Sequence, residues 1–157
     1  MYNNIDFNFK KILITGGAGF IGSNLALYFQ ENFPNSRIVV FDCFRSNETF
    51  ANGNLKSFGH YNNLINFTGD IICGNINSKI DLALLADFKF DYIFHHAAIS
   101  DTRVYDQEII MKTNVNSFND LLEIDIGDLL GRKSVNPNNE FLNITFTHCE
   151  RRHVFYI

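Results

Sequence analysis

The sequence predicts an α/β fold, a Rossmann-like doubly wound parallel sheet that is truncated after its fourth strand and the helix that follows. First, a short apolar strand at residues 11–15 runs directly into Gly16 and further glycines, and an apolar helix pattern follows them. Second, strand and helix patterns alternate up to about residue 124, which indicates parallel strands joined by right-handed crossovers. Third, Asp42 closes the second predicted strand 20 residues after Gly22, the arrangement of a dinucleotide-binding unit.

The first half of the chain contains two strands and one long helix. Lys11–Thr15 is a short apolar run that is typical of a buried strand. Phe20–Asn32 has apolar residues at helical spacing and ends before Pro34, which cannot continue a helix. Arg37–Asp42 is rich in β-branched residues and is the second strand. We expect a short helix within Leu55–Leu64.

The next elements repeat the alternation. We expect a third strand around Thr68–Cys73 and a helix that Ser78 caps and that continues to Asp87. Asp91–Ala97 is the fourth strand, and Thr102–Ile124 contains a long helix with an apolar stripe. The predicted strand order is 3-2-1-4. Ligands of such sheets bind at the carboxyl ends of the strands where the order reverses, here between strands 1 and 4.

The regular pattern ends after Ile124. Asp125–Glu140 contains glycines, a proline and several asparagines, which suits a loop, and Phe141–Thr147 alternates weakly, as an added fifth strand would. The terminal residues 154–157 fit no pattern. We therefore expect a domain at residues 1–124 and an atypical tail at 125–157, an added strand or a frameshifted segment. Such a half sheet would expose an edge and an apolar face beside strand 4, which favours self-association.

Composition sets the class of protein. The chain has 157 residues, of which 46% are hydrophobic and 19% charged, so it is long enough for one domain with its own core. Its net charge of −4 argues against a nucleic-acid partner. The cysteines Cys43, Cys73 and Cys149 are odd in number and widely spaced, as free thiols of a reducing cytosol are. We expect a cytoplasmic protein with no signal peptide and no membrane contact, because no apolar run approaches about 20 residues.

The glycine-rich loop predicts a site for a pyrophosphate. Gly17 would allow the tight turn after the strand, and Gly19 would let the backbone approach the phosphates. Gly22 would bring the helix close to the sheet. The free N–H groups at the start of the helix would then face the anion. We infer that the chain binds a dinucleotide.

Polar residues at the ends of strands 2 and 3 predict where the adenosine lies. A carboxylate at Asp42 would accept hydrogen bonds from the ribose hydroxyls and repel a 2′-phosphate, which favours NAD. Arg45 follows three residues later and could pair with a 2′-phosphate, so NADP stays open. The alternative for Asp42 is a carboxylate in a surface turn. Asn75 and Ile76 could flank the adenine, or they could form an ordinary strand end.

Other candidates for chemistry have plainer interpretations. Adjacent histidines on a strand, such as His95 and His96, point to opposite faces, so they do not chelate one ion easily. The tail's histidines and Cys149 lack the second cysteine pair of a zinc site, and we expect no metal. Tyr105 and Lys112 are seven residues apart, too far for the lysine to lower the pKa of the tyrosine by direct contact, and both are interpreted as surface residues.

The chain resembles the extended short-chain dehydrogenase/reductase family of nucleotide-sugar epimerases and dehydratases, over roughly residues 10–124. The resemblance lies in Thr15-Gly16-x-x-Gly19-x-x-Gly22, Asp42, His96-Ala97-Ala98 and Asn114. The segments that resemble the ADP-glyceromanno-heptose 6-epimerase branch are Phe44-Arg45-Ser46-Asn47, Phe94 to Thr102, and Met111-Lys112-Thr113-Asn114. The resemblance implies transient oxidation of a sugar carbon by bound NAD or NADP, and return of the hydride to the other face of that carbon.

The resemblance also implies cofactor contacts at Phe20, Ile21, Asp42, Ala97, Ala98 and Asn114. With the residues at the strand ends, the expected cofactor-binding set is Gly16, Gly19, Phe20, Ile21, Gly22, Asp42, Cys43, Arg45, Asn75, Ile76, Ala97, Ala98, Ser100 and Asn114. No tyrosine of the chain has a lysine four residues later, so the family's Tyr-x-x-x-Lys pair is not found and no catalytic residue is assigned.

Three functional hypotheses follow from this departure. The chain is a remnant that binds the cofactor without catalysis, an epimerase whose catalytic groups another chain supplies, or a redox-sensing or regulatory binding module. The missing Tyr-x-x-x-Lys pair favours the first. A nucleotide sugar is an expected partner only if the missing half is supplied.

Overall fold

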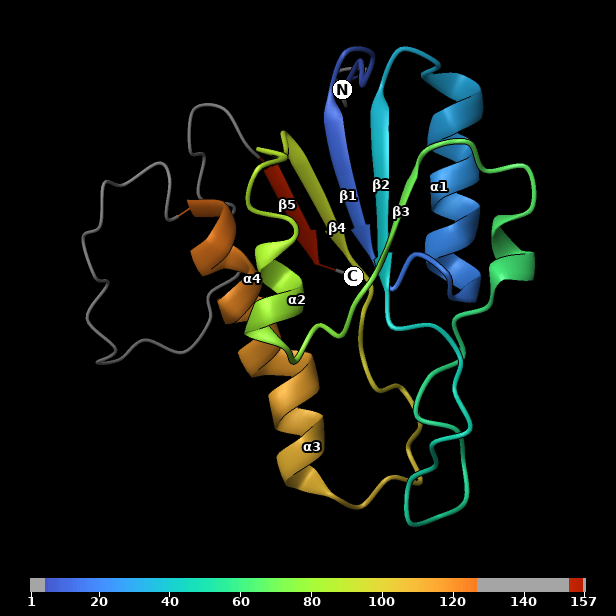
Figure 1. The fold of residues 1–157 in the computed structure, drawn as a ribbon, viewed down its shortest axis with the longest axis vertical. Coiled ribbons are helices and arrows are strands. Elements are labelled where there is room, and N and C mark those ends of the chain that lie inside the picture. Colours follow the sequence, from blue (N-terminus) through green and yellow to red (C-terminus); the bar gives the residue numbers. More distant parts are fainter. Residues whose placement is uncertain (1–4, 127–152, 157) are drawn as a thin grey trace.

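The computed structural model of the chain describes residues 5–126 and 153–156, which form a parallel sheet with helices on both faces (Figure 1). Its elements in chain order are β1 (Lys11–Thr15), α1 (Phe20–Asn32), β2 (Arg37–Asp42), the short 3₁₀ helix η1 (Tyr61–Leu64), β3 (Asp70–Cys73), α2 (Lys79–Ala83), β4 (Tyr92–His95), α3 (Gln107–Met111), the π-helical turn η2 (Lys112–Asn116), α4 (Ser117–Ile126) and β5 (His153–Tyr156).

The strands lie in the order β3-β2-β1-β4-β5, and each neighbouring pair is parallel. The predicted order 3-2-1-4 is therefore confirmed, with the switch point between β1 and β4. The register brings Thr15 beside Phe41 of β2 and beside His95 of β4, so the carboxyl ends of the three central strands coincide. A ligand that binds at this edge meets all three strand ends.

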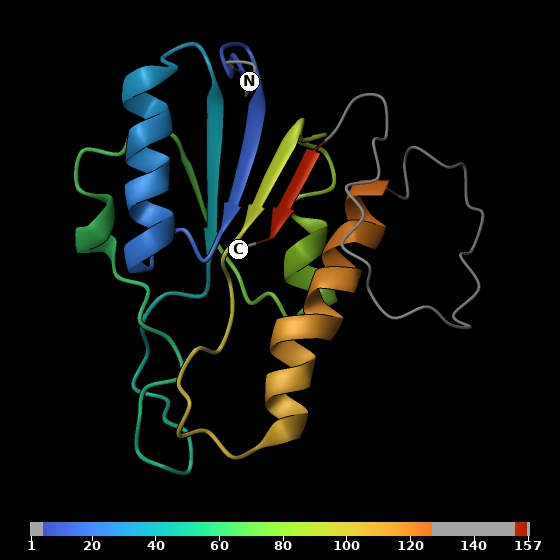
Figure 2. The same ribbon diagram turned by 180° about the vertical axis from the view of Figure 1, so that it is seen from behind.

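Two hydrophobic layers hold the helices against the sheet. Alternate residues of β1 point to opposite faces, so Ile12 and Ile14 pack on the α1 face and Leu13 packs on the other. Phe29 of α1 belongs to the first layer. Leu82 of α2 and Leu121 of α4 belong to the second, as do Val39, Phe41 and Ile93 of the strands. Figure 2 shows α1 and the helices α2 and α4 on opposite sides of the sheet.

The fifth strand was not predicted at its observed place. His153–Tyr156 pairs in parallel with Tyr92–His95, whereas the expected strand at residues 141–147 lies outside the described residues. Consequently β4 is not the edge of the sheet, and the prediction of an exposed edge there was wrong. Pairing with a strand that is distant in sequence depends on tertiary contacts, and four residues carry no periodicity that would predict it.

The apolar face beside β4 is covered, also against expectation. Tyr92 and Phe94 are only 7% and 8% exposed. The ring of Phe7, from the segment before β1, packs edge-on against Tyr92 at 4.8 Å and against Phe29 at 4.9 Å between centroids. An aromatic residue ahead of the first strand therefore supplies cover on this face of the sheet.

The helix boundaries differ from the predicted ones for local reasons. The range Thr102–Ile124 does contain a long helical stretch. It starts at Gln107 because the Asp106 carboxylate accepts hydrogen bonds from the N–H groups of Glu108 and Ile109 and caps the helix. Ser78 caps α2 as predicted, but regular helix ends at Ala83. None of the helices that the structure describes combines the length and apolar character needed to cross a membrane.

Candidate functional site

The glycine loop lies between β1 and α1, at the edge where the carboxyl ends of β1, β2 and β4 meet (Figure 1). Gly16 makes the turn, with φ of +65°, a conformation that favours glycine. A Cβ on Gly16 would lie 2.7 Å from the backbone N of Ala97. The turn was predicted at Gly17, which instead lacks room for a Cβ because Val40 of β2 lies against it.

Gly22 lets the start of α1 lie against the glycine loop, whereas the prediction was a close approach to the sheet. A Cβ there would stand 2.5 Å from the carbonyl oxygen of Gly16 and 2.7 Å from Cα of Gly17. Both neighbours are backbone atoms, which cannot move aside as a side chain can. The close approach fixes the first turn of α1 relative to the end of β1.

Gly19 differs from the other two glycines because space remains beside it. It is the N-cap of α1, with extended φ and ψ of −74° and 174°, and within 4 Å a Cβ would meet only the Gly16 carbonyl oxygen, at 3.2 Å. No side chain of the described residues caps α1, so its first N–H groups remain available to a ligand. An anion at this helix start would meet the positive end of the helix dipole.

Asp42 at the end of β2 is joined to the glycine loop. Its Oδ2 accepts a hydrogen bond from the N–H of Ala18 at 2.9 Å, and its Oδ1 accepts one from Phe44 at 2.9 Å. The residue is only 7% exposed, which excludes a carboxylate in a surface turn. Burial raises the pKa of Asp42, and the backbone hydrogen bonds partly oppose this rise. The predicted ribose contact stays a prediction.

The segment after Asp42 turns back on itself. Phe44 has φ of +51° and is 6% exposed, and its ring stacks on Tyr61 with centroids 3.9 Å apart. Cys43 and Arg45 are exposed on either side of it. The backbone N–H of Arg45 donates to the carbonyl of Gly59 at 2.6 Å. The sequence offered one signal for the buried Phe44, an aromatic residue between two polar ones.

The residues predicted beside the adenine separate in the structure. Asn75 is exposed, and its side-chain oxygen accepts a hydrogen bond from the N–H of Asn77 at 2.9 Å. Ile76 is 7% exposed and packs in the core with Leu13 and Phe41. A core position is the ordinary role of an isoleucine at a strand end, so of the two only Asn75 presents itself at the surface.

A hydrogen-bonded pair connects β1 with the loop after β4. Thr15 Oγ1 lies 2.7 Å from His95 Nδ1 and accepts a hydrogen bond from the N–H of Ala97 at 3.3 Å. His95 is 1% exposed, and burial lowers its pKa to about 4, so the imidazole is neutral near pH 7. Sequence reasoning missed this link, which ties the start of the loop at Ala97 to the end of β1, beside the glycine loop.

His95 and His96 lie in different surroundings at the end of β4. His95 packs beside Phe118, with centroids 5.1 Å apart, on the face that carries α4. His96 is half-buried, and burial lowers its pKa as well. Within residues 5–126 and the described part of β5, no group of three or more histidine, cysteine, aspartate or glutamate side chains could hold a metal ion.

Asn114, in η2, secures the loop after β4. Its Oδ1 accepts a hydrogen bond from the N–H of Ile99 at 2.7 Å, and its Nδ2 donates to the carbonyl of Ile99 at 3.0 Å. The side chain thus pairs with Ile99 as a neighbouring strand would. Ala97 is partly exposed, and Ala98 and Ser100 are exposed, along this loop. Their contact with a cofactor stays a prediction, as does that of Phe20 and Ile21, which are 82% and 63% exposed at the start of α1.

Tyr105 and Lys112 are surface residues, as interpreted. Tyr105 is 88% exposed and precedes α3, while Lys112 is exposed on the first turn of η2. Within the described residues, neither makes a hydrogen bond to the glycine loop or to Asp42. Tyr105 and Lys112 therefore do not form an acid–base pair at the edge that carries the glycine loop.

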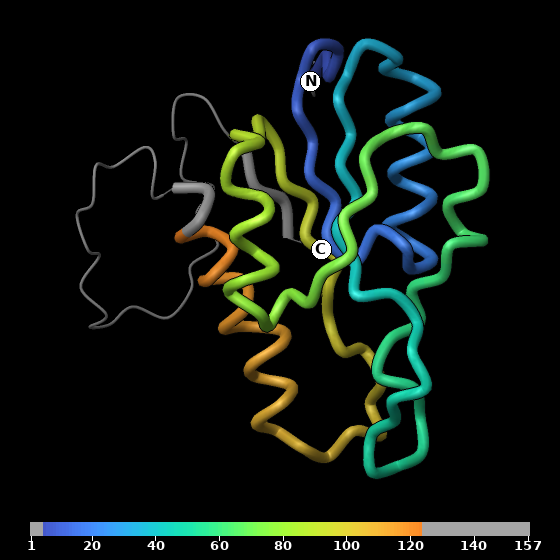
Figure 3. Tube along the Cα trace, in the orientation of Figure 1, coloured from blue at the N-terminus to red at the C-terminus, as the bar shows by residue number. Residues whose placement is uncertain are grey.

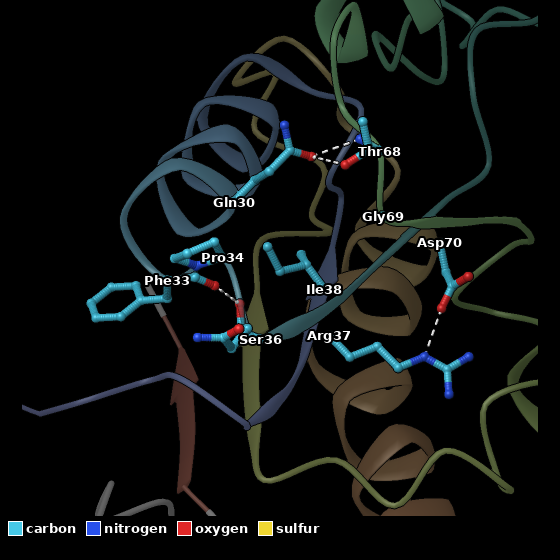
Figure 4. A pocket seen from close by; sticks show the side chains of 10 residues that line it. Gln30, Phe33, Pro34, Ser36, Arg37, Ile38, Thr68, Gly69 and Asp70 are labelled. Carbon is cyan, nitrogen blue, oxygen red and sulfur yellow. Dashed lines mark hydrogen bonds and ion pairs between the residues drawn. The ribbon is translucent and has the colours of Figure 1, made fainter.

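A shallow pocket of about 290 Å³ lies elsewhere, at the amino ends of β2 and β3 (Figure 4). Its polar walls are already paired: Arg37 Nε lies 2.8 Å from Asp70 Oδ2, and Gln30 Oε1 accepts hydrogen bonds from Thr68. The pocket is at the opposite end of the strands from the glycine loop and is separate from the site described above.

Comparisons with known proteins agree with this geometry. A solved structure of ADP-L-glycero-D-manno-heptose-6-epimerase from Helicobacter pylori is 49% identical, with a TM-score of 0.70, and the match covers 81% of this chain and 39% of that one. The Bordetella bronchiseptica enzyme WbmG, solved in complex with NAD and UDP, is 28% identical with a TM-score of 0.57, over 72% of this chain and 32% of that one. The fold is therefore that of the Rossmann-like part of these enzymes.

Sequence relatives give the same assignment. The ADP-L-glycero-D-manno-heptose-6-epimerase of Brachyspira hyodysenteriae is 32% identical over 72% of this chain, and the dTDP-D-glucose 4,6-dehydratase of Dictyostelium discoideum is 39% identical over 62% of it. The chain spans 32% and 21% of the lengths of these two relatives. Residues 12–124 match the model of the NAD dependent epimerase/dehydratase family. The chain belongs to the NAD dependent epimerase/dehydratase family.

Proposed function

We propose that this chain binds NAD(H) at the carboxyl edge of its sheet, as the cofactor-binding part of a nucleotide-sugar epimerase similar to the heptose epimerases. The observation that carries the proposal is the start of α1. Gly19 leaves space beside an uncapped helix N-terminus, where the N–H groups of Phe20 and Ile21 can meet a pyrophosphate. A family relative solved in complex with NAD and UDP supports the same ligand class.

The remaining residues fit the two ends of such a ligand. Asp42 has one oxygen bonded to Ala18 and the other to Phe44, and its remaining acceptor capacity would serve a ribose hydroxyl. On the other side of the glycine loop, the Ala97–Ser100 segment follows the end of β4. Hydrogen bonds to Thr15 and Asn114 hold its backbone in place. The nicotinamide, when bound, would accept a hydride from a sugar carbon and return it.

We propose NAD in preference to NADP. A 2′-phosphate beside Asp42 would meet a carboxylate that is held in place by two hydrogen bonds and would be repelled. Arg45 is exposed at the end of the same turn and is the one residue of the predicted set that could offset this repulsion. The choice between the two cofactors therefore depends on the balance of these two side chains.

We also propose that these 157 residues alone do not catalyse epimerisation. A sugar hydroxyl must lose its proton as the hydride leaves, and a positioned acid–base group contributes about 10²–10⁴-fold to such a step. The sequence contains no Tyr-x-x-x-Lys pair. The role that the residues support is therefore binding and orientation of the cofactor.

Hydrogen–deuterium exchange with NADH tests the proposed function. We expect NADH to slow exchange at the amides of Gly19–Gly22 and of Ala97–Ile99, and to leave the amides beside the Arg37–Asp70 pocket unchanged. Protection at that pocket, or no protection at the glycine loop at saturating NADH, would contradict the proposal.

A further inference from the structure

Two loops leave the carboxyl edge of the sheet on opposite sides of the glycine loop. The first, residues 43–60, follows β2 and is bound to the glycine loop at its far end, where the N–H of His60 donates to the carbonyl of Ala18 at 3.0 Å. The second, residues 96–106, follows β4 and is bound to β1 at its start, where the N–H of Ala97 donates to Thr15 Oγ1. The two loops extend away from the sheet and converge (Figures 1 and 3).

The loops are joined at Asp101. The side-chain amide of Asn54 donates a short hydrogen bond to Asp101 Oδ2, and Asn52 Nδ2 donates to the carbonyl of Arg103 at 3.0 Å. These bonds connect residues that are 47 and 51 positions apart in sequence. Asn52 Nδ2 also lies 3.4 Å from Asp101 Oδ2. We call this contact between Asn52, Asn54 and Asp101 the loop clamp.

Each oxygen of Asp101 serves a different loop. Oδ1 accepts hydrogen bonds from the backbone N–H and from Nε of Arg103, both at 3.0 Å, within its own loop. Oδ2 faces the other loop and accepts from Asn54. Hydrogen bonds from the Arg103 backbone and guanidinium lower the pKa of Asp101 to about 2, so the clamp is charged at neutral pH.

The asparagines are held ready for this contact. Thr49 and Leu55 form an antiparallel bridge, and the N–H of Phe50 donates to the carbonyl of Asn54 at 2.8 Å. Gly53, with φ of +83°, makes the turn between Asn52 and Asn54. On the other side, Asn114 fixes the backbone of Ile99 two residues before Asp101. The clamp therefore joins two segments that are each ordered by their own contacts.

We propose that Asp101 is a positioning residue that closes the two loops around the bound dinucleotide and slows its release. The inference rests on the proposed function. Three hydrogen bonds, His60–Ala18, Asn54–Asp101 and Ala97–Thr15, together with the chain between them form a closed ring at the edge where the cofactor would bind. A ligand inside the ring leaves more slowly when the clamp is intact. A clamp that served only to stabilise the fold would not alter the release rate.

Stopped-flow displacement of NADH from the full chain tests the inference. The variant Asn52→Ala/Asn54→Ala removes the donors across the loops. We expect the dissociation rate constant to rise about tenfold, less than the full strength of the two hydrogen bonds, because one is exposed and the other only partly buried. The matched control is Lys56→Ala, which removes the ion pair with Glu48 within one loop and leaves the side chains of the clamp in place. We expect its rate constant to stay within about twofold of the original.

A partner exchange makes the test specific. Asn54→Asp places a carboxylate against Asp101 and should speed release, and the double variant Asn54→Asp/Asp101→Asn restores an amide–carboxylate pair and should restore slow release. Unchanged dissociation in Asn52→Ala/Asn54→Ala, an equal increase in Lys56→Ala, or failure of the exchange to restore slow release would overturn the inference alone. Absence of NADH binding to the unchanged chain would instead overturn the proposed function, and the inference with it.

Discussion

The Oδ2 atom of Asp42 lies 2.9 Å from the backbone nitrogen of Ala18, so the end of β2 is hydrogen-bonded directly to the glycine loop between β1 and α1. Asp42 is thus both part of the wall of the proposed site and a support for the loop that would hold the phosphates. A change at this residue should therefore affect both the strength of dinucleotide binding and the discrimination between cofactors.

We expect Asp42→Ala to weaken NADH binding and to shift the ratio of NADPH to NADH affinity toward NADPH by about tenfold, equivalent to about 1.4 kcal/mol. The variant removes a hydrogen-bond acceptor for the ribose and the negative charge that would repel a 2′-phosphate. Competition titrations with both cofactors measure the ratio. The control is Asp6→Ala, at an exposed carboxylate before β1. An unchanged ratio in Asp42→Ala would remove Asp42 from the site.

The glycines should separate stability from binding. Gly22→Ala puts a Cβ 2.5 Å from a backbone oxygen, and we expect it to lower the free energy of unfolding by about 2 kcal/mol. Gly19→Ala has an extended backbone and a Cβ contact of 3.2 Å, so its cost should stay below about 1 kcal/mol. Urea unfolding of the two variants checks this order, and equal destabilisation would contradict the described packing of α1.

Stability should fall on mild acidification because of His95. Its pKa is about 4 in the folded chain, against 6.5 for an ordinary histidine. Between these pH values the unfolded chain binds a proton that the folded chain does not, and this favours unfolding. The destabilisation is absent above pH 6.5 and grows as the pH falls toward 4. Relative to the variant His95→Gln, we expect the chain to lose roughly 3 kcal/mol of unfolding free energy between pH 7 and pH 4. If the unfolding free energy of the two proteins changed equally with pH, the pKa of His95 would not be lowered in the folded chain.

We expect no epimerase turnover from the 157-residue chain. Incubation with ADP-heptose and NAD or NADP, followed by separation of the two C6 epimers, measures this directly. Turnover that persists through further purification and disappears in Gly19→Val would contradict the expectation. It would point to a base outside the Tyr-x-x-x-Lys pattern, and Tyr105 would be the first residue to replace.

The sequence predicted those parts of the fold that local patterns determine. The first four strands are apolar runs with turn residues at their ends, and their order followed from the alternation with helices. The strand His153–Tyr156 could not be predicted, because its place depends on pairing with β4. The sequence predicted a long helix within Thr102–Ile124 but not its first residue, which depends on the capping carboxylate of Asp106.

The candidate site divides in the same way. The strand–glycine–helix pattern located the loop, and the spacing to Asp42 located the second strand end. Gly16, not Gly17, makes the turn, and Gly17 lies against Val40. Neither the φ angle nor the packing against β2 can be predicted from the spacing of the glycines. The stack of Phe44 on Tyr61 and the clamp at Asp101 are contacts between distant segments, and no local pattern indicates them.

Calorimetric titration of NADH into the chain and into Gly19→Val tests the central claim most directly, since Gly19 is the glycine beside which the fold leaves space for a ligand. We expect one site per chain, and loss of binding in Gly19→Val while the urea midpoint stays close to that of the unchanged protein. Equal NADH affinity for the two proteins would contradict a phosphate site at the glycine loop.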